Sequence, residues 1–153
     1  MRNRRLFRGL CASLVLVSVM ACSAGDPEQT RKEGIAFLEA NAKKEGVMVT
    51  PSGLQYKILQ PGSGAQPAAS DSVTVNYRGE LTNGSEFDSG QGISFPLSGV
   101  IAGWTEGLQL MKEGAKYRFF IPSELAYGES GAARVIPPNA ALVFDVELVK
   151  VNR

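Results

Sequence analysis

Apolar and polar residues alternate along several stretches of the second two thirds of the chain. Residues 54–59, 72–81 and 142–151 follow the two-residue period of a strand that buries one face. Residues 116–121 are also expected to form a strand, and a short strand is expected around residues 93–95. In the last stretch Leu142, Phe144, Val146 and Leu148 fall on one face. The pattern therefore predicts a sheet with one apolar side.

One segment inside this strand-rich region has helical periodicity. In residues 101–112, Trp104, Leu108 and Met111 recur at i, i+4 and i+7, which places them on one side of a helix. Asn83-Gly84 predicts a type I′ hairpin turn, in which both residues have positive φ. The order of strand, strand, short strand, helix, strand, long loop and strand predicts an α+β fold, an antiparallel sheet covered on one face by a single helix.

A short N-terminal helix is expected at residues 30–46. Thr30 and Glu33 fit a capping box, and the helix is expected to stop near Gly46. Its narrow apolar stripe consists of Ile35, Leu38 and Ala42. Such a helix can lie against the domain, lie in solvent or belong to a dimerisation arm. Two large apolar side chains bury too little area to hold a dimer alone, so we expect a monomer, with a weak dimer as the alternative.

The first residues of the chain have the features of a bacterial export signal. Residues 1–9 contain four arginines and no acidic residue, and the apolar run over residues 10–20 is shorter than the roughly 20 residues of a membrane-spanning helix. Residues 19–22 (VMAC) resemble the lipobox, which implies a signal peptide at 1–21, a lipidated Cys22 and a tether over 22–29. The alternative is an ordinary signal peptide or uncleaved anchor in which Cys22 is incidental. The lipobox interpretation predicts a lipid-anchored envelope protein at the outer membrane, facing the periplasm or the surface.

Composition excludes several classes of function. The 153 residues include no histidine, which excludes imidazole-based triads, histidine general bases and histidine metal sites. Two cysteines, Cys11 and Cys22, are too few for a four-thiolate zinc site, and we expect no metal or other cofactor. The net charge of +1 gives no drive toward nucleic acid, and without the four arginines of residues 1–21 the charge is −3.

Six blocks of sequence, taken in order, resemble a known family. They are residues 75–79 (VNYRG), 86–89 (EFDS), 100–104 (VIAGW), 121–122 (IP), 126–128 (AYG) and 136–148 (IPPNAALVFDVEL). Over residues 50–153 the chain resembles the macrolide-binding FKBP-type peptidyl-prolyl cis-trans isomerases. Residues 45–56 are similar to the junction found in the macrophage-infectivity-potentiator-like branch. The resemblance implies an isomerase domain at 50–153 with an FKBP-like fold, a twisted antiparallel sheet wrapped around one short amphipathic helix.

The resemblance also implies a proline-binding pocket. Its catalytic residues would be Tyr77, Asp88, Tyr127 and Phe144, and its substrate-binding residues Phe87, Phe95, Val100, Ile101, Trp104 and Ile136. Trp104 would form the floor, while the Tyr127 hydroxyl and the Ile101 N–H would bind substrate carbonyls. In the loop 130–135, Ala132 stands where many eukaryotic relatives have histidine, which leaves sequence preference and macrolide affinity open.

Three of these residues have a second interpretation. The Asp88 carboxylate could orient the Tyr77 hydroxyl or interact with the twisted amide, or it could cap a turn after Phe87. Trp104 and Phe144, considered without the surrounding blocks, would be core residues on a helix and a strand.

The implied activity needs none of the chemistry that the composition excludes. Rotation about an Xaa-Pro bond makes and breaks no covalent bond, so an apolar aromatic pocket can catalyse it without nucleophile, metal or base. The expected partners are unfolded or partly folded proteins with Xaa-Pro bonds, together with macrolide inhibitors. Two alternatives remain: a non-catalytic chaperone or binding module using the same groove, and a host-interaction surface protein with secondary isomerase activity.

Overall fold

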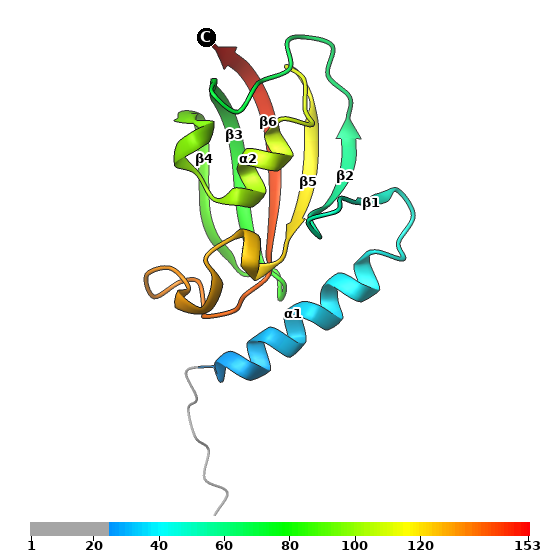
Figure 1. Ribbon diagram of the computed structural model, residues 1–153, viewed down its shortest axis with the longest axis vertical. Helices are drawn as coiled ribbons and strands as arrows, with labels where there is room; N and C mark the ends of the chain where they lie inside the picture. Colours follow the sequence, from blue (N-terminus) through cyan, green and yellow to red (C-terminus); the bar gives the residue numbers. More distant parts are fainter. Residues whose placement is uncertain (1–24) are drawn as a thin grey trace, which may run out of the picture.

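The computed structural model of the protein describes residues 25–153 (Figure 1). Six strands in this part of the chain form one antiparallel sheet in the order β1-β2-β5-β6-β3-β4. The strands are β1 (Val47–Val49), β2 (Gln55–Gln60), β3 (Ser72–Leu81), β4 (Glu86–Pro96), β5 (Lys116–Ile121) and β6 (Leu142–Asn152). The strand β6 lies in the middle of the sheet: it pairs with β3 from Leu142 to Asn152 and with β5 from Leu142 to Glu147.

The predicted strand alternation is confirmed in the centre of the sheet. β3 and β5 coincide with the stretches predicted at 72–81 and 116–121, and β6 buries its apolar face as expected. β4 is longer than the short strand expected around residues 93–95, and β1 was not predicted. Both lie at edges of the sheet, where burial imposes less pattern on the sequence.

The helix α2 (Ala102–Leu108) packs on the inner face of the sheet and confirms the predicted α+β fold (Figure 1). Trp104 and Leu108 are buried on it, whereas Met111 is buried just after the helix, which is shorter than predicted. A Cβ atom at Gly103 or Gly107 would lie 2.6 Å from side-chain atoms of β5. These glycines therefore let the helix backbone approach the sheet closely.

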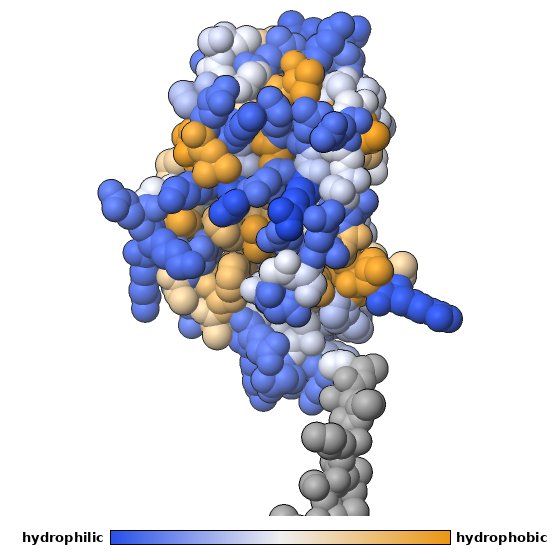
Figure 2. Space-filling view, turned by 180° about the vertical axis from the view of Figure 1, so that it is seen from behind, coloured by the Kyte–Doolittle hydropathy of each residue, from blue (hydrophilic) through white to orange (hydrophobic). Residues whose placement is uncertain are grey.

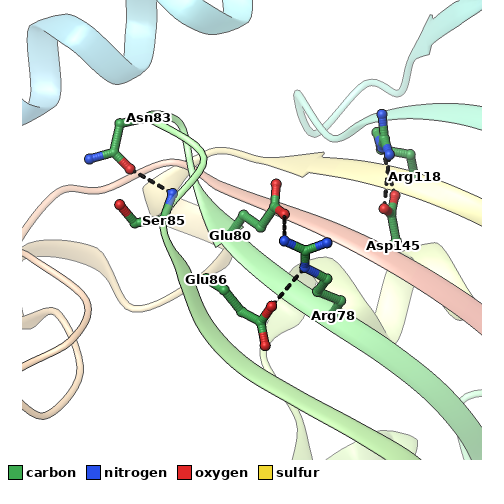
Figure 3. Close-up of polar contacts among 7 residues, drawn as sticks. All are labelled: Arg78, Glu80, Asn83, Ser85, Glu86, Arg118 and Asp145. Carbon is green, nitrogen blue, oxygen red and sulfur yellow. Dashed lines mark hydrogen bonds and ion pairs between the residues drawn. The ribbon is translucent and has the colours of Figure 1, made fainter.

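The β3–β4 turn is not the predicted type I′ hairpin. Only Gly84 has a positive φ, of 85°, and its N–H donates to the Leu81 carbonyl at 2.9 Å. Leu81 N–H in turn donates to the Ser85 carbonyl, which makes a three-residue hairpin loop with a left-handed glycine at its end. Asn83 instead accepts a 2.9 Å hydrogen bond from the Ser85 N–H through its side chain (Figure 3).

The N-terminal helix α1 (Pro27–Asn41) begins before the predicted residue 30 and ends before residue 46. Asp26 is its N-cap and accepts a 3.0 Å hydrogen bond from the Glu28 N–H, so the predicted capping box on Thr30 and Glu33 is wrong. Pro27 suits the first helical position because a helix leaves that N–H unbonded in any case.

The face that α1 buries is not the predicted apolar stripe. Ile35 is 49% exposed, whereas Gly34 and Asn41 are buried against the domain. The Asn41 Nδ2 group donates to Gln55 Oε1 at 2.8 Å, and the Gln55 amide donates to a carbonyl of the helix at 2.8 Å. Among the alternatives for this helix, the structure shows the one in which it lies against the domain.

Three short 3₁₀ helices complete the described elements: η1 (Leu97–Gly99), η2 (Ser123–Leu125) and η3 (Gly128–Ser130). The predicted signal peptide and Cys22 lie outside residues 25–153. Inside that range no helix is both long and apolar enough to cross a membrane.

Candidate active site

A pocket of about 450 Å³ opens between α2 and the inner faces of β3, β4 and β6. A volume of this size suits a small molecule or a short peptide segment. Its lining residues are Tyr77, Phe87, Asp88, Phe95, Gly99, Val100, Ile101, Trp104, Tyr127 and Phe144. The structure therefore brings together every predicted site residue except Ile136.

Aromatic rings form the base of the pocket. Trp104 lies at its centre, with ring centroids 5.2 Å from Tyr77, 5.6 Å from Phe95 and 5.3 Å from Phe144, each nearly perpendicular to the indole. Phe87 packs edge-on against Phe144 at 5.4 Å. Edge-to-face contacts of this kind favour one arrangement of the rings, so the pocket is preformed.

Gly79 makes room for this cluster, a role that the sequence analysis missed. It follows Tyr77 by two residues on β3, so a side chain there would point to the same inner face. A Cβ atom at Gly79 would lie 2.6 Å from ring atoms of both Phe87 and Phe144. The signal in the sequence is a glycine in the interior of a strongly alternating strand, which often marks a close approach.

Asp88 and Tyr77 form the polar side of the pocket. The Tyr77 hydroxyl donates to Asp88 Oδ2 at 2.8 Å. Burial, together with the hydrogen bond and the charge of Asp88, raises the pKa of Tyr77 to about 12, so the phenol is neutral at physiological pH. Asp88 lies within β4 opposite Gly79, and this position agrees with the interpretation in which it orients the hydroxyl.

Two N–H groups of the pocket-lining residues have no acceptor among residues 25–153. Ile101 is the N-cap of α2, and its backbone N–H makes no hydrogen bond there. The buried indole Nε1 of Trp104 also has no partner. The Thr105 hydroxyl fixes the preceding turn by donating to the Leu97 carbonyl at 2.6 Å. The pocket therefore combines apolar walls with a free backbone donor at Ile101, whereas the indole N–H is buried.

The loop that follows β5 places Tyr127 at the pocket mouth and Ile136 in the core. Tyr127 is 41% exposed, next to η3. Ile136 is 5% exposed and its backbone exchanges two hydrogen bonds with Ala132, at 3.0 and 3.1 Å. This pairing fixes the backbone so that the Ile136 side chain packs into the core. Ile136 is not among the residues that line the pocket, and its role in substrate binding stays a prediction. Gly99 lines the pocket instead and was not predicted.

Comparison with protein-family profiles matches the part of the chain that contains the pocket. The profile of the family described as "FKBP-type peptidyl-prolyl cis-trans isomerase" matches residues 63–149. A second profile, "Domain amino terminal to FKBP-type peptidyl-prolyl isomerase", matches residues 18–58, which include α1.

Individual relatives agree with the profiles. The chain is 54% identical over 132 residues to an FKBP-type isomerase, FkpA, of Aeromonas hydrophila, covering 84% of this chain and 49% of the relative. It is 47% identical over 130 residues to the outer membrane protein MIP of Legionella longbeachae, covering 82% of this chain and 56% of that protein. The chain thus spans about half the length of the curated relatives it matches.

A solved structure supports the fold. The crystal structure of a peptidyl-prolyl cis-trans isomerase from Pseudomonas syringae superposes with a TM-score of 0.81 at 39% identity, covering 86% of this chain and 99% of the other. Together with the profile match and the preformed aromatic pocket, these similarities show that the chain belongs to the FKBP-type peptidyl-prolyl cis-trans isomerase family.

Proposed function

We propose that this protein is a peptidyl-prolyl cis-trans isomerase that acts on Xaa-Pro bonds of unfolded or partly folded proteins. The observation that carries the proposal is the pocket itself, with Trp104 as its floor and aromatic rings as its walls. A pyrrolidine ring is small and apolar, and a cavity of this size and character has room for it together with the neighbouring residues of a peptide.

The mechanism follows from the electronic structure of the amide. The Xaa-Pro bond has a rotation barrier of about 18–20 kcal/mol because the nitrogen lone pair is delocalised into the carbonyl. The twisted transition state loses that delocalisation, so its amide is less dipolar than the planar ground state. An apolar pocket therefore destabilises the twisted form less than the planar forms, which is differential binding of the transition state.

The polar groups of the site hold the peptide while the bond rotates. The Ile101 N–H and the Tyr127 hydroxyl would bind substrate carbonyls on either side of the proline, and Asp88 would keep the Tyr77 hydroxyl in one orientation. A macrolide that mimics the proline and its neighbouring carbonyls would occupy the same groups. No step requires proton transfer, which suits a chain without histidine.

The test is a cis-trans exchange measurement on a short Xaa-Pro peptide with the full chain. We expect wild-type protein to accelerate exchange, Trp104→Leu to lose most of the acceleration, and Val149→Ala, which alters an exposed side chain, to retain it. Well-folded wild-type protein that binds the peptide without changing the exchange rate would contradict the proposal and favour a non-catalytic binding module.

We also propose that the protein is attached to the bacterial envelope through Cys22. The support is the lipobox-like sequence at residues 19–22 and the name of the Legionella relative, an outer membrane protein. In this scheme residues 1–21 are the signal peptide, and residues 50–153 act as a monomeric isomerase domain at the outer membrane. Cys22→Ser should move the protein from the membrane fraction to the soluble fraction, whereas continued partitioning with membranes would contradict the anchor.

A further inference from the structure

The loop between Tyr127 and β6, orange in Figure 1, lies near the N-terminal end of the helix α1. One end of this loop carries Tyr127 at the pocket mouth, and the other end, around Asn139, contacts α1. The two contacts are twelve residues apart in the sequence, at positions 127 and 139, but a backbone hydrogen bond between Asn139 and Gly128 joins them, so the position of α1 can affect the pocket.

Asn139 links the two regions directly. Its backbone N–H donates to the carbonyl of Gly128, the residue after Tyr127, at 2.8 Å. Its side-chain Nδ2 group donates to the carbonyl of Pro27, the first residue of α1, at 3.1 Å. Asn139 is only 9% exposed and has a φ of 62°, a left-handed conformation that asparagine tolerates better than most residues. A single buried residue therefore fastens both the loop and the helix.

The helix packs against the same segment along its length. A Cβ atom at Gly34 would lie 3.3 Å from the Cβ of Ala141 and 3.8 Å from the Asn139 carbonyl oxygen. The Arg31–Glu129 ion pair, at 3.9 Å between exposed side chains, adds little. Close packing at Gly34, rather than charge, keeps α1 against residues 139–141.

The loop has few bonds of its own. Apart from the Asn139 contact, its backbone bonds are the pair between Ala132 and Ile136 and a 3.4 Å bond from the Gly131 N–H to the Gly128 carbonyl. Gly128, Gly131 and Ala133 have positive φ values of 59°, 61° and 48°, which for alanine is strained. A loop of this kind depends on outside contacts for its conformation: Ile136 and Ala140 are buried in the domain core, and α1 supplies the contact with Asn139.

We infer that α1, acting through Asn139, is a positioning element for the active site: it holds the loop that presents Tyr127 to the substrate. This inference rests on the proposed isomerase function. Asn139 is accordingly a positioning residue, since it does not line the pocket.

Two variants of the full chain break the link at different points. Asn139→Gly keeps the backbone N–H and tolerates the positive φ but removes the bond to Pro27. Gly34→Leu leaves the loop sequence unchanged and forces the helix away from Ala141. Ala36→Leu is the matched control, because it makes a similar change in size at an exposed position of the same helix.

Each of the first two variants should raise the KM for an Xaa-Pro peptide about fivefold with little change in kcat, because Tyr127 holds ground and transition states alike. Hydrogen exchange at the Ala132 and Ile136 amides should accelerate about tenfold while amides of β6 remain protected. Ala36→Leu should change neither. The double variant, Asn139→Gly with Gly34→Leu, should have a KM no higher than that of the more impaired single variant, because both substitutions break the same contact between α1 and the loop.

Unchanged exchange at Ala132 and Ile136 in Asn139→Gly and Gly34→Leu would overturn the inference, as would accelerated exchange with a wild-type KM. Slower hydrogen exchange in Asn139→Gly or Gly34→Leu than in the wild-type protein would also contradict it. Failure of the proposed function is a different result, since it appears as an inactive wild-type protein. In that case the exchange data alone would still decide whether α1 holds the loop.

Discussion

The two faces of strands β3 and β6 are built from neighbouring residues and have opposite characters. Tyr77 and Phe144 point inward to the aromatic pocket, whereas Arg78 and Asp145, one residue further along each strand, point outward and form ion pairs (Figure 3). Seen from behind the sheet, the surface is mainly hydrophilic, with scattered apolar side chains (Figure 2). The two-residue period of a strand thus separates the candidate chemistry from the solvated surface.

The outward face relies on bonds that water and salt can replace. Arg78 contacts Glu80 at 2.6 Å and Glu86 at 2.8 Å, and Arg118 binds both carboxylate oxygens of Asp145 at 2.6 and 2.8 Å (Figure 3). These side chains are about half exposed, so each pair contributes on the order of 0–1 kcal/mol to stability. The inward face relies on ring packing, which water cannot replace. The same strands therefore contain one face that tolerates substitution and one that does not.

Neighbouring substitutions on β6 should show the largest contrast. Phe144→Ala should lower the free energy of unfolding by about 3–5 kcal/mol, because the ring is 4% exposed and contacts three other rings, and it should also abolish most activity. Asp145→Asn should lower it by less than about 1 kcal/mol and leave activity unchanged. Denaturant unfolding measures both, and equal losses would show that the two faces are not energetically distinct.

Adjacent substitutions on β3 should give the next largest effect. Gly79→Ala should cost about 1–3 kcal/mol, because the added methyl group meets the Phe87 and Phe144 rings, and it should reduce activity by displacing them. Arg78→Ala removes only exposed ion pairs and serves as the control. Thermal unfolding and peptide exchange measure the pair of variants. A Gly79→Ala protein with wild-type activity would contradict the role assigned to this close approach.

Substitutions of Asp88 distinguish two roles of its carboxylate: orienting the Tyr77 hydroxyl and acting on the substrate amide through its charge. Asp88→Ala should lower kcat/KM about tenfold, equivalent to ~1.4 kcal/mol, with a stability loss below about 1 kcal/mol because the contact is exposed. Asp88→Asn retains an oxygen that can accept from the Tyr77 hydroxyl, so it should keep most of the activity. If the asparagine variant is as slow as the alanine variant, the carboxylate charge acts on the amide and orientation is not its role.

The last effect should be seen only at high pH. The pKa of Tyr77 rises from 10.0 to about 12 on folding, so between these values the folded protein keeps a proton that the unfolded chain releases. The free energy of unfolding should therefore fall as pH rises from about 10 to about 12, and Tyr77→Phe should lack this component. Denaturant unfolding of both proteins at several pH values measures the difference. A constant difference across that window would contradict the contact with Asp88 as the environment of Tyr77.

The parts of the fold that the sequence predicted are those in which one face is buried. β3 and β6 alternate because every second residue enters the core, and their bounds could be read from that period, whereas the last three residues of β5 are all buried. β4 contains Gly90 and Gly92, and its pairing with β3 is irregular. Its sequence therefore has no regular alternation from which the length of the strand could be predicted. The buried face of α1 could not be predicted from hydrophobicity, because it contains a glycine and an asparagine.

The site divides in the same way. Side chains such as Trp104 and Phe144 could be assigned because family motifs mark them, although periodicity alone would have made them core residues. Gly79 and Gly99 contribute space or backbone, which motif reasoning about side chains overlooks. Ile136 is not among the pocket-lining residues, and its orientation depends on a backbone pairing with Ala132 that is set by tertiary structure and leaves no periodic signal.

The start of α1 at Pro27 also limits how far the domain can travel. If Cys22 carries the proposed lipid, five residue steps separate the anchor from the helix, and an extended chain of that length spans at most about 18 Å. Because α1 is docked on the domain, its 15 residues add nothing to this tether. The domain would then work within a thin layer beside the bilayer, on chains that emerge or fold next to the membrane surface.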